Sequence, residues 1–295
     1  MSAQGRDEPS SSGAGNRSAE ATAKVTIPGL KARKLAGEKI TALTAYDYPS
    51  GLLADEAGIE LILVGDSLSN TILGYANTLP VTLDEMLTAV RAVRRAVRSA
   101  LLIGDMPFGS YHTGEASALE AGVAFLKAGA EGVKLEGGTR RAGLVRALVE
   151  NEIPVLGHIG LTPQSIHAFG GYRIQGTTPE DADALVEDAL ALERAGAFAI
   201  VIEGVPSSVA EMITSKVDVP TIGIGAGSSC DGQILVFADL IGLTRGKKPK
   251  FVRQYLDMHS AALQAIQAYR RDVRSGDFPS AAESYEAPAV RTAKG

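Results

Sequence analysis

Only one cysteine, Cys230, occurs among the 295 residues of the chain. An internal disulfide is therefore impossible, which favours a reducing compartment, and we expect a cytoplasmic protein. No apolar run approaches the roughly 18 residues that a membrane-spanning helix needs. The first residues also lack the apolar segment of a secretory signal. The sequence thus disfavours both a membrane protein and a secreted one.

Positive charge is also scarce. Lys and Arg number 29 against 34 Asp and Glu, which gives a formal net charge of −5 and a pI near 5.5. Nucleic acids and anionic membranes both select clustered Lys and Arg, so neither is an expected partner. The one basic stretch, RAVRRAVR at 91–98, places its arginines on the outward face of a predicted helix, where we interpret them as solvated.

Large apolar side chains are nearly missing from residues 1–24. Such a segment cannot bury enough surface to offset the entropy lost on ordering, so we predict a disordered tail. Asp7, Glu8 and Glu20 argue against an organelle transit peptide, because that class avoids acidic residues. The rest of the chain is expected to form one folded domain and a flexible C-terminus, over residues 25–286 and 287–295.

Short apolar runs alternate with amphipathic stretches along the rest of the chain. The runs lie at 40–45, 60–64, 100–104, 132–136, 153–159, 198–203, 220–225 and 234–242. They are continuously apolar, which indicates burial on both faces and therefore parallel pairing. About eight strand–helix units predict an α/β fold, a single closed (β/α)8 TIM barrel. An open doubly wound sheet is the competitor, but the first turn, AYDYPSG, lacks a glycine-rich phosphate fingerprint.

Helical periodicity fills the intervals between the runs. The clearest helix, over residues 81–97, opens with Thr82 and Glu85 at capping-box spacing. A last helix is expected from about residue 249 to 273. Its apolar side would consist of Phe251, Tyr255, Ala262, Ile266, Tyr269 and Val273.

Polar and charged side chains stand at the ends of the predicted strands. In a barrel these ends converge on one mouth, which carries the active site. The residues concerned are Asp47, Asp66, Ser67, Asp105, Lys134, Glu136, His158, Glu203 and the GIGAG run at 223–227. A cluster this acidic would raise its own pKa values unless a positive charge lay within it, and Lys134 or a divalent cation could supply that charge.

Hard oxygen donors without thiolates suit Mg²⁺ better than Zn²⁺. Asp66 and Asp105 are therefore candidate direct ligands, and Glu136 is a candidate that would act through water. Each residue also has a purely structural interpretation. An aspartate after a strand is often only a helix N-cap, and Asp47, just before PSGLLADEAG, comes closest to that case.

The other candidates differ in how readily structure alone explains them. His158 could equally be a satisfied core histidine. Lys134 and Glu203 are harder to explain in that way, because burying a charge without a role is costly. The glycines at 223–227 could cradle a phosphate or could mark close packing.

Longer stretches match a known family in order. They are TALTAYDY (41–48), LVGDSL (63–68), LPVTLDEM (79–86), DMPFGSY (105–111), VKLEGG (133–138), GHIGLTPQS (157–165), FGGYRIQG (169–176) and GIGAGSSCDGQILV (223–236). Through them the chain resembles the ketopantoate hydroxymethyltransferases over nearly all of residues 41–279. The family is a set of Mg²⁺-dependent barrel enzymes of pantothenate biosynthesis.

The resemblance implies transfer of a hydroxymethyl group from 5,10-methylenetetrahydrofolate to 3-methyl-2-oxobutanoate. The products would be 2-dehydropantoate and tetrahydrofolate, by way of a Mg²⁺-stabilised enolate. It also implies a homo-oligomer, since relatives assemble as decamers. Carried over by position, the metal site comprises Asp66, Asp105 and Glu136. The keto acid would lie against Asp66, Ser67, Asp105, Lys134 and His158, and Glu203 would accept the proton.

Two stretches depart from the family pattern, and the N-terminal tail is longer than the barrel needs. QGTTPED at 175–181 stands where relatives tend to have a glycine and acidic residues, and FPSAAESYE at 278–286 lacks a usual histidine. Both stretches could affect loop closure or the entrance for the folate.

Two other functions stay open from the sequence. One is a Mg²⁺-dependent lyase that cleaves a carbon–carbon bond of a 2-oxo acid, for which Cys230 would be the only available thiol acid or base. The other is a barrel that only binds a small acid or serves as a scaffold.

Overall fold

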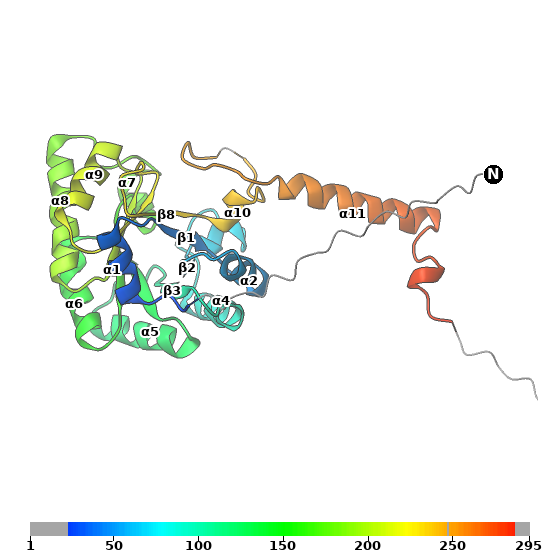
Figure 1. Ribbon diagram of the computed structural model, residues 1–295, viewed down its shortest axis with the longest axis horizontal. Coiled ribbons are helices and arrows are strands. Elements are labelled where there is room, and N and C mark those ends of the chain that lie inside the picture. Colours follow the sequence, from blue (N-terminus) through cyan, green and yellow to red (C-terminus); the bar gives the residue numbers. More distant parts are fainter. Residues whose placement is uncertain (1–22, 247, 287–295) are drawn as a thin grey trace, which may run out of the picture.

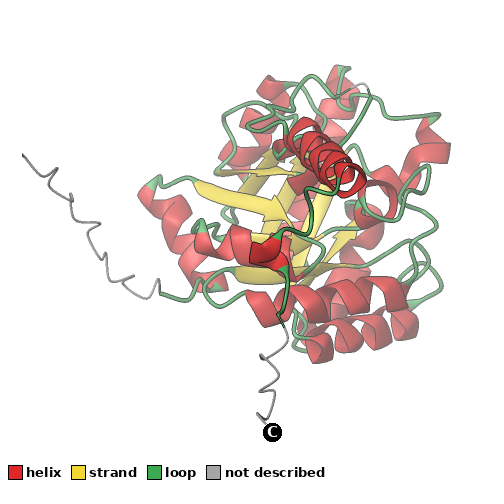
Figure 2. Cartoon of the chain, turned by 90° about the vertical axis from the view of Figure 1, so that its right-hand side faces the viewer, coloured by secondary structure: helices red, strands yellow, loops and turns green. Residues whose placement is uncertain are grey.

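The computed structural model describes residues 23–246 and 248–286. Eight parallel strands close into a barrel in chain order, with β8 paired to β1 (Figure 2). The strands are β1 (Ile40–Thr44), β2 (Leu61–Val64), β3 (Leu101–Asp105), β4 (Gly132–Glu136), β5 (Val155–Gly160), β6 (Ala199–Glu203), β7 (Thr221–Ile224) and β8 (Gly232–Leu235). The predicted TIM barrel is confirmed. The tail predicted at 1–24 falls outside the described residues except for the last two, and the C-terminus predicted at 287–295 lies wholly outside them.

Helices surround the barrel and follow most of the strands (Figures 1 and 2). They are α1 (Ile27–Ala36), α2 (Tyr48–Glu56), α3 (Leu68–Thr71), α4 (Leu83–Ala96), α5 (Glu115–Ala128), α6 (Ala142–Glu150), α7 (Ile166–Phe169), α8 (Pro179–Arg194), α9 (Ser207–Lys216), α10 (Phe237–Leu240) and α11 (Met258–Ser275), with short 3-10 turns at Thr139–Arg141, Pro163–Ser165 and Ala281–Glu283. The predicted capping box of α4 is confirmed. The Thr82 hydroxyl accepts from the Glu85 backbone N–H at 3.3 Å, and the Glu85 carboxylate accepts from the Thr82 backbone N–H at 2.8 Å. No helix in the described ranges is long and apolar enough to cross a bilayer.

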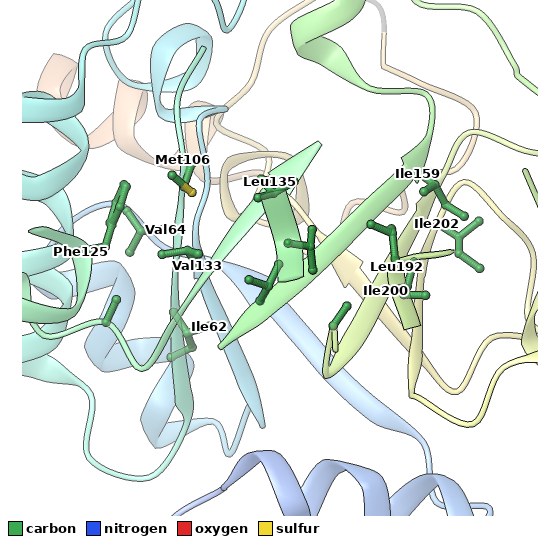
Figure 3. Close-up of a cluster of buried hydrophobic side chains, with 14 of the residues drawn as sticks. Ile62, Val64, Met106, Phe125, Val133, Leu135, Ile159, Leu192, Ile200 and Ile202 are labelled. Atoms are coloured by element: carbon green, nitrogen blue, oxygen red, sulfur yellow. The ribbon is translucent and has the colours of Figure 1, made fainter. Parts of the chain in front are cut away.

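Most of the strands bury side chains on both of their faces. In β2, Ile62 and Val64 point outward into the cluster between strands and helices, while Leu61 and Leu63 point into the barrel (Figure 3 shows the outer cluster). This two-sided burial is the physical reason for the continuous apolar runs in the sequence.

The inner cluster fills the end of the barrel where the strands begin. Ile40, Leu61 and Leu101 are the first residues of their strands and belong to this cluster. Leu30 of α1 joins them and is fully buried. The N-terminal end of the barrel is therefore closed by apolar packing.

Two expectations about the last part of the barrel are wrong. The strand predicted at 234–242 ends at Leu235, and α10 follows because the Phe237 N–H donates to Thr44 Oγ1 at 3.0 Å instead of continuing a strand ladder. The expected helix between β7 and β8 is absent, since residues 225–231 connect these strands directly. Gln233, on the outer face of β8, is consequently exposed.

The last helix begins later than expected and leaves the barrel. α11 starts at Met258 and projects away from the strands (Figure 1). None of its residues is buried, and Ile266 is 64% exposed. Phe251 precedes the helix and packs against the inner cluster instead.

Candidate active site

All seven site residues predicted from the sequence line one small cavity at the C-terminal ends of the strands. The cavity holds about 100 Å³. Its charged and polar members are Asp66 and Ser67 after β2, Asp105 at the end of β3, Lys134 and Glu136 in β4, His158 in β5 and Glu203 at the end of β6.

Strand register explains why these side chains meet. In the parallel ladders, Asp105 pairs with Lys134, and Glu136 pairs with His158. Lys134 and Glu136 are two residues apart in β4, so both face the barrel interior. Lys134 Nζ accordingly lies 2.9 Å from Asp105 Oδ1 and 3.7 Å from Glu136 Oε1.

Lys134 is the positive centre of a buried acidic group. Burial alone would lower its pKa, but Asp105, Glu136 and Asp66 outweigh burial and raise it above its ordinary value. The lysine therefore stays charged. Burial by itself would raise the pKa of Glu136, yet Lys134 and His158 together lower it.

The two aspartates differ from Glu136. Burial, reinforced by Asp105, holds the pKa of Asp66 well above its ordinary value. Burial also raises the pKa of Asp105, although Lys134 opposes this shift. One lysine thus leaves Asp66 and Asp105 short of positive charge, and a further cation beside them would favour their ionised forms.

The donor set fits Mg²⁺ on these grounds. Asp66 and Asp105 are buried oxygen donors at neighbouring strand ends, and thiols are absent from the cavity lining. The described part of the chain contains no group of three His, Cys, Asp or Glu side chains spaced to hold a metal. Mg²⁺ needs no such cage, because it typically takes one or two carboxylates and completes its shell with water and substrate oxygens.

His158 lies between two glutamates. Its Nδ1 is 3.5 Å from Glu136 Oε1, and its Nε2 is 3.3 Å from Glu203 Oε2. Burial and Lys134 lower the pKa of His158, but the two carboxylates outweigh them and raise it to about 9. His158 is therefore part of the charged cavity and not an isolated core histidine.

Sequence reasoning missed two buried residues that hold the acidic group in place. Gln164 Nε2 donates to Asp66 Oδ2 at 2.9 Å, and the Gln164 backbone N–H donates to Glu136 Oε2 at 3.0 Å. The Tyr111 hydroxyl donates to Gln164 Oε1 at 2.6 Å. Both residues occur in the matching stretches DMPFGSY and GHIGLTPQS, and this was the only signal that could have found them.

Two other predicted strand-end features have structural roles. The Asp47 carboxylate caps α2 by accepting from the Ser50 backbone N–H at 2.8 Å, which confirms the N-cap interpretation. A Cβ on Gly225 would lie 2.6 Å from the Phe251 ring. The glycine run is thus closely packed, as its second interpretation expects.

Comparison with known proteins identifies the family of the chain. The family model described as "Ketopantoate hydroxymethyltransferase" matches residues 24–281. A protein from Koribacter versatilis (strain Ellin345), named 3-methyl-2-oxobutanoate hydroxymethyltransferase, is 55% identical over 266 residues, which cover 90% of each chain. A protein of the same name from Thermotoga sp. (strain RQ2) is 51% identical over 256 residues, or 86% of this chain and 95% of that one.

Solved structures of much lower identity share the fold. Phosphonopyruvate hydrolase in complex with oxalate and Mg²⁺ superposes with a TM-score of 0.56 at 18% identity, covering 88% of this chain and 93% of the other. The 2,3-dimethylmalate lyase structure gives a TM-score of 0.56 at 17% identity, with coverages of 85% and 88%. These likenesses concern the barrel alone, whereas the family model and the relatives at half identity span nearly the whole chain. The chain belongs to the ketopantoate hydroxymethyltransferase family.

Proposed function

We propose that this protein transfers a hydroxymethyl group from 5,10-methylenetetrahydrofolate to 3-methyl-2-oxobutanoate in the cytoplasm, as a step of pantothenate biosynthesis. The products are 2-dehydropantoate and tetrahydrofolate, and one water supplies the new hydroxyl group. The names of the relatives support the acceptor and the transfer. The observation that carries the proposal is the small cavity, which holds a buried positive centre and a separate carboxylate, Glu203.

The keto acid binds at the positive side of the cavity. Lys134 remains charged there and attracts the carboxylate and keto oxygens of the acid. Ser67 lines the same cavity and offers a hydroxyl to the acid; its Oγ is held 2.8 Å from the Tyr46 hydroxyl. Mg²⁺, held by Asp66 and Asp105 with Glu136 nearby, would supply Lewis-acid stabilisation of negative charge on the keto oxygen.

Glu203 is the proton acceptor. It lies on β6, across the cavity from Asp66 and Asp105, and its side chain is 17% exposed while theirs are buried. Glu203 takes the proton from C3, and the negative charge that develops on the keto oxygen is stabilised by Lys134. His158 contacts Glu203 at 3.3 Å and orients that carboxylate.

The resulting enolate carbon then attacks the methylene group of the folate carrier. The new carbon–carbon bond forms as one of the two carbon–nitrogen bonds to the methylene breaks, and water then replaces the second nitrogen, which gives the hydroxymethyl group and tetrahydrofolate. The chain contributes to this step by holding both reactants in line.

The lyase alternative finds no support in the position of the thiol. Cys230 is buried, precedes the first residue of β8 and lies outside the lining of the cavity. A thiol acid or base would have to reach the substrate at the opposite end of the strands. We therefore prefer the transferase.

The test is turnover of the keto acid with the folate carrier, with and without Mg²⁺, for the wild type and Glu203→Gln. We expect Mg²⁺-dependent product and a loss of about 10²- to 10⁴-fold in the variant, the usual contribution of a general base. The variant should still unfold in one cooperative urea transition, which shows that the loss of turnover is not a loss of folding. No product from folded, Mg²⁺-loaded wild type would contradict the proposed reaction.

We also propose that the protein assembles as a homo-oligomer, a decamer by resemblance to its family. α11 presents an apolar stripe to solvent that includes Leu263, Ile266 and Tyr269, and β8 lacks a covering helix on its outer face. A second copy of the chain could cover both surfaces. Ile266→Asp should lower the mass measured by light scattering, while Arg271→Asp, an exposed position on the opposite side of the same helix, serves as the charge control. An unchanged mass in both variants would contradict a role for α11.

A further inference from the structure

A second, larger cavity lies beside the small one. It holds about 430 Å³ and is formed by the connection after β4, the connection after β5 and the first half of α8. Small-molecule sites usually measure about 300–1,000 Å³. The small cavity, at about 100 Å³, has room for a short keto acid and no room for a folate.

The two cavities share a wall. Glu136 lines both of them, and the adjacent residues Pro163 and Gln164 line the small and the large cavity respectively. The large cavity is therefore adjacent to the one that lies against the reacting carbon. A carrier that delivers a one-carbon unit needs this arrangement, since most of its bulk lies away from the chemistry.

The large cavity combines apolar surface with positive charge. Ile159, Phe169 and Leu185 offer apolar contact, and Arg140 and Arg141 lie on the lining. Arg141 lies 5.3 Å from the ring centre of Tyr111. Neither arginine forms an ion pair with a carboxylate anywhere in residues 23–246 and 248–286.

Most of the acidic side chains on the lining already have partners. Glu136 accepts from the Gln164 backbone N–H and lies near Lys134. Asp188 accepts from the Thr139 N–H at 2.7 Å and from its hydroxyl at 2.8 Å. Asp181 lies in the first turn of α8, where the helix dipole offsets its charge. The two arginines are thus the groups available to an incoming anion.

We propose that this cavity binds the p-aminobenzoylglutamate half of the folate carrier, with Arg140 and Arg141 at the glutamate carboxylates. The inference rests on the proposed function and names the carrier's site within it. The benzoyl ring lies against the apolar side of the cavity, and the one-carbon end crosses the wall at Glu136 and Pro163. The stretch at 175–181 that departs from the family pattern contributes Gln175, Gly176 and Asp181 to the same lining.

The experiment compares two carriers. One is 5,10-methylenetetrahydrofolate, and the other is 5,10-methylenetetrahydropteroate, which lacks the glutamate. We expect the wild type to show a KM about 10- to 100-fold higher for the second carrier, the usual loss for a hydrogen-bonded charge pair. Arg140→Ala and Arg141→Ala should raise the KM for the first carrier similarly and should no longer distinguish the two.

Exchange of the C3 hydrogen of the keto acid in D2O, without any folate, measures proton removal in the keto-acid pocket. This exchange needs the base and the keto-acid pocket alone, so both arginine variants should retain the wild-type rate. Arg141→Lys keeps the charge over Tyr111. Its KM for the first carrier should lie between those of the wild type and Arg141→Ala. Arg146→Ala on α6, an exposed arginine outside the lining, is the matched control and should behave as the wild type.

The outcomes separate the two proposals. The wild type could exchange the C3 hydrogen and form product, yet have the same KM for both carriers. That result would overturn the glutamate site and leave the proposed function in place. An equal loss for both carriers in Arg140→Ala and Arg141→Ala would also overturn it. A folded wild type with neither exchange nor turnover would overturn the proposed function, and the carrier site with it.

Discussion

The two ends of the barrel are built from the same eight strands and have opposite chemistry. At the N-terminal end, Leu30, Ile40 and Leu61 form a fully apolar closure. At the C-terminal end, Lys134 lies among three buried carboxylates. Apolar burial at the N-terminal end stabilises the fold. At the C-terminal end, the desolvation of buried charges lowers the stability of the fold. Stability and chemistry are therefore placed at opposite ends of the same barrel.

Removing the positive charge at the C-terminal end should have the largest effect. Lys134→Met would leave Asp66, Asp105 and Glu136 facing one another without a counter-charge. We expect a loss of at least about 10²-fold in turnover and of about 3–5 kcal/mol in the free energy of unfolding at pH 7. Turnover assays and urea denaturation in EDTA measure these losses.

The loss of stability should shrink at pH 5, where protonation removes the repulsion among the carboxylates. Lys31→Met, an exposed lysine of α1, is the matched control. A variant as stable as the wild type at pH 7 would show that Lys134 does not neutralise the acidic group.

Shortening a buried side chain at the N-terminal end of the barrel should lower the free energy of unfolding and leave turnover unchanged. Leu30→Ala removes a fully buried side chain and should cost about 2–5 kcal/mol in the free energy of unfolding. Its kcat at 25 °C should stay within about twofold of wild type, because the cavity lies at the other end of the strands.

The control for that truncation is Leu35→Ala, since Leu35 is 79% exposed and should cost less than about 0.5 kcal/mol. A fall in kcat as large as that of Lys134→Met would contradict the separation between the two ends.

The charge on His158 gives the smallest expected effect. Its pKa is raised to about 9 in the folded protein, so the native state binds more protons than the unfolded state between pH 6.5 and 9. The contribution to stability is therefore complete below about pH 6.5 and is lost as the pH rises through 9, amounting to at most about 3 kcal/mol.

Denaturation of the EDTA-treated wild type and His158→Gln across this pH range measures that contribution. The wild type should lose stability more steeply than the variant, and His167→Gln, at an exposed histidine, should follow the wild type. Parallel curves for all three proteins would show that the two glutamates do not hold the proton.

Local patterns in the sequence predicted the barrel and the residues at its mouth. Continuous apolar runs located the strands, and polar or charged side chains at the ends of most runs located the cavity, because parallel strands bring their ends together. Asp47 showed the limit of this reasoning: it follows β1 as Asp66 follows β2, yet it caps α2. The nearby Ser50 and the helix pattern carried the local signal that separates the two cases.

Contacts between distant segments could not be predicted in this way. Gln164 bonds to Asp66, which is 98 residues earlier in the chain, and to Tyr111, which is 53 residues earlier. No periodic pattern or spacing rule connects such positions. The missing helix between β7 and β8 is a different case: residues 225–231 read GAGSSCD, a short run of mostly turn-forming residues, so the sequence itself disfavoured a helix there.

The position of Lys134 and Glu136 on one face of β4 has a consequence for how this site tolerates genetic change. Their neighbours Val133 and Leu135 face outward, so inserting or deleting one residue before Lys134 within the strand would exchange the two pairs. The composition of the strand would hardly differ, yet two charges would enter the helix layer and two aliphatic side chains would enter the cavity. A point substitution therefore changes one side chain of this strand at a time. A single insertion or deletion would instead remove both Lys134 and Glu136 from the cavity at once.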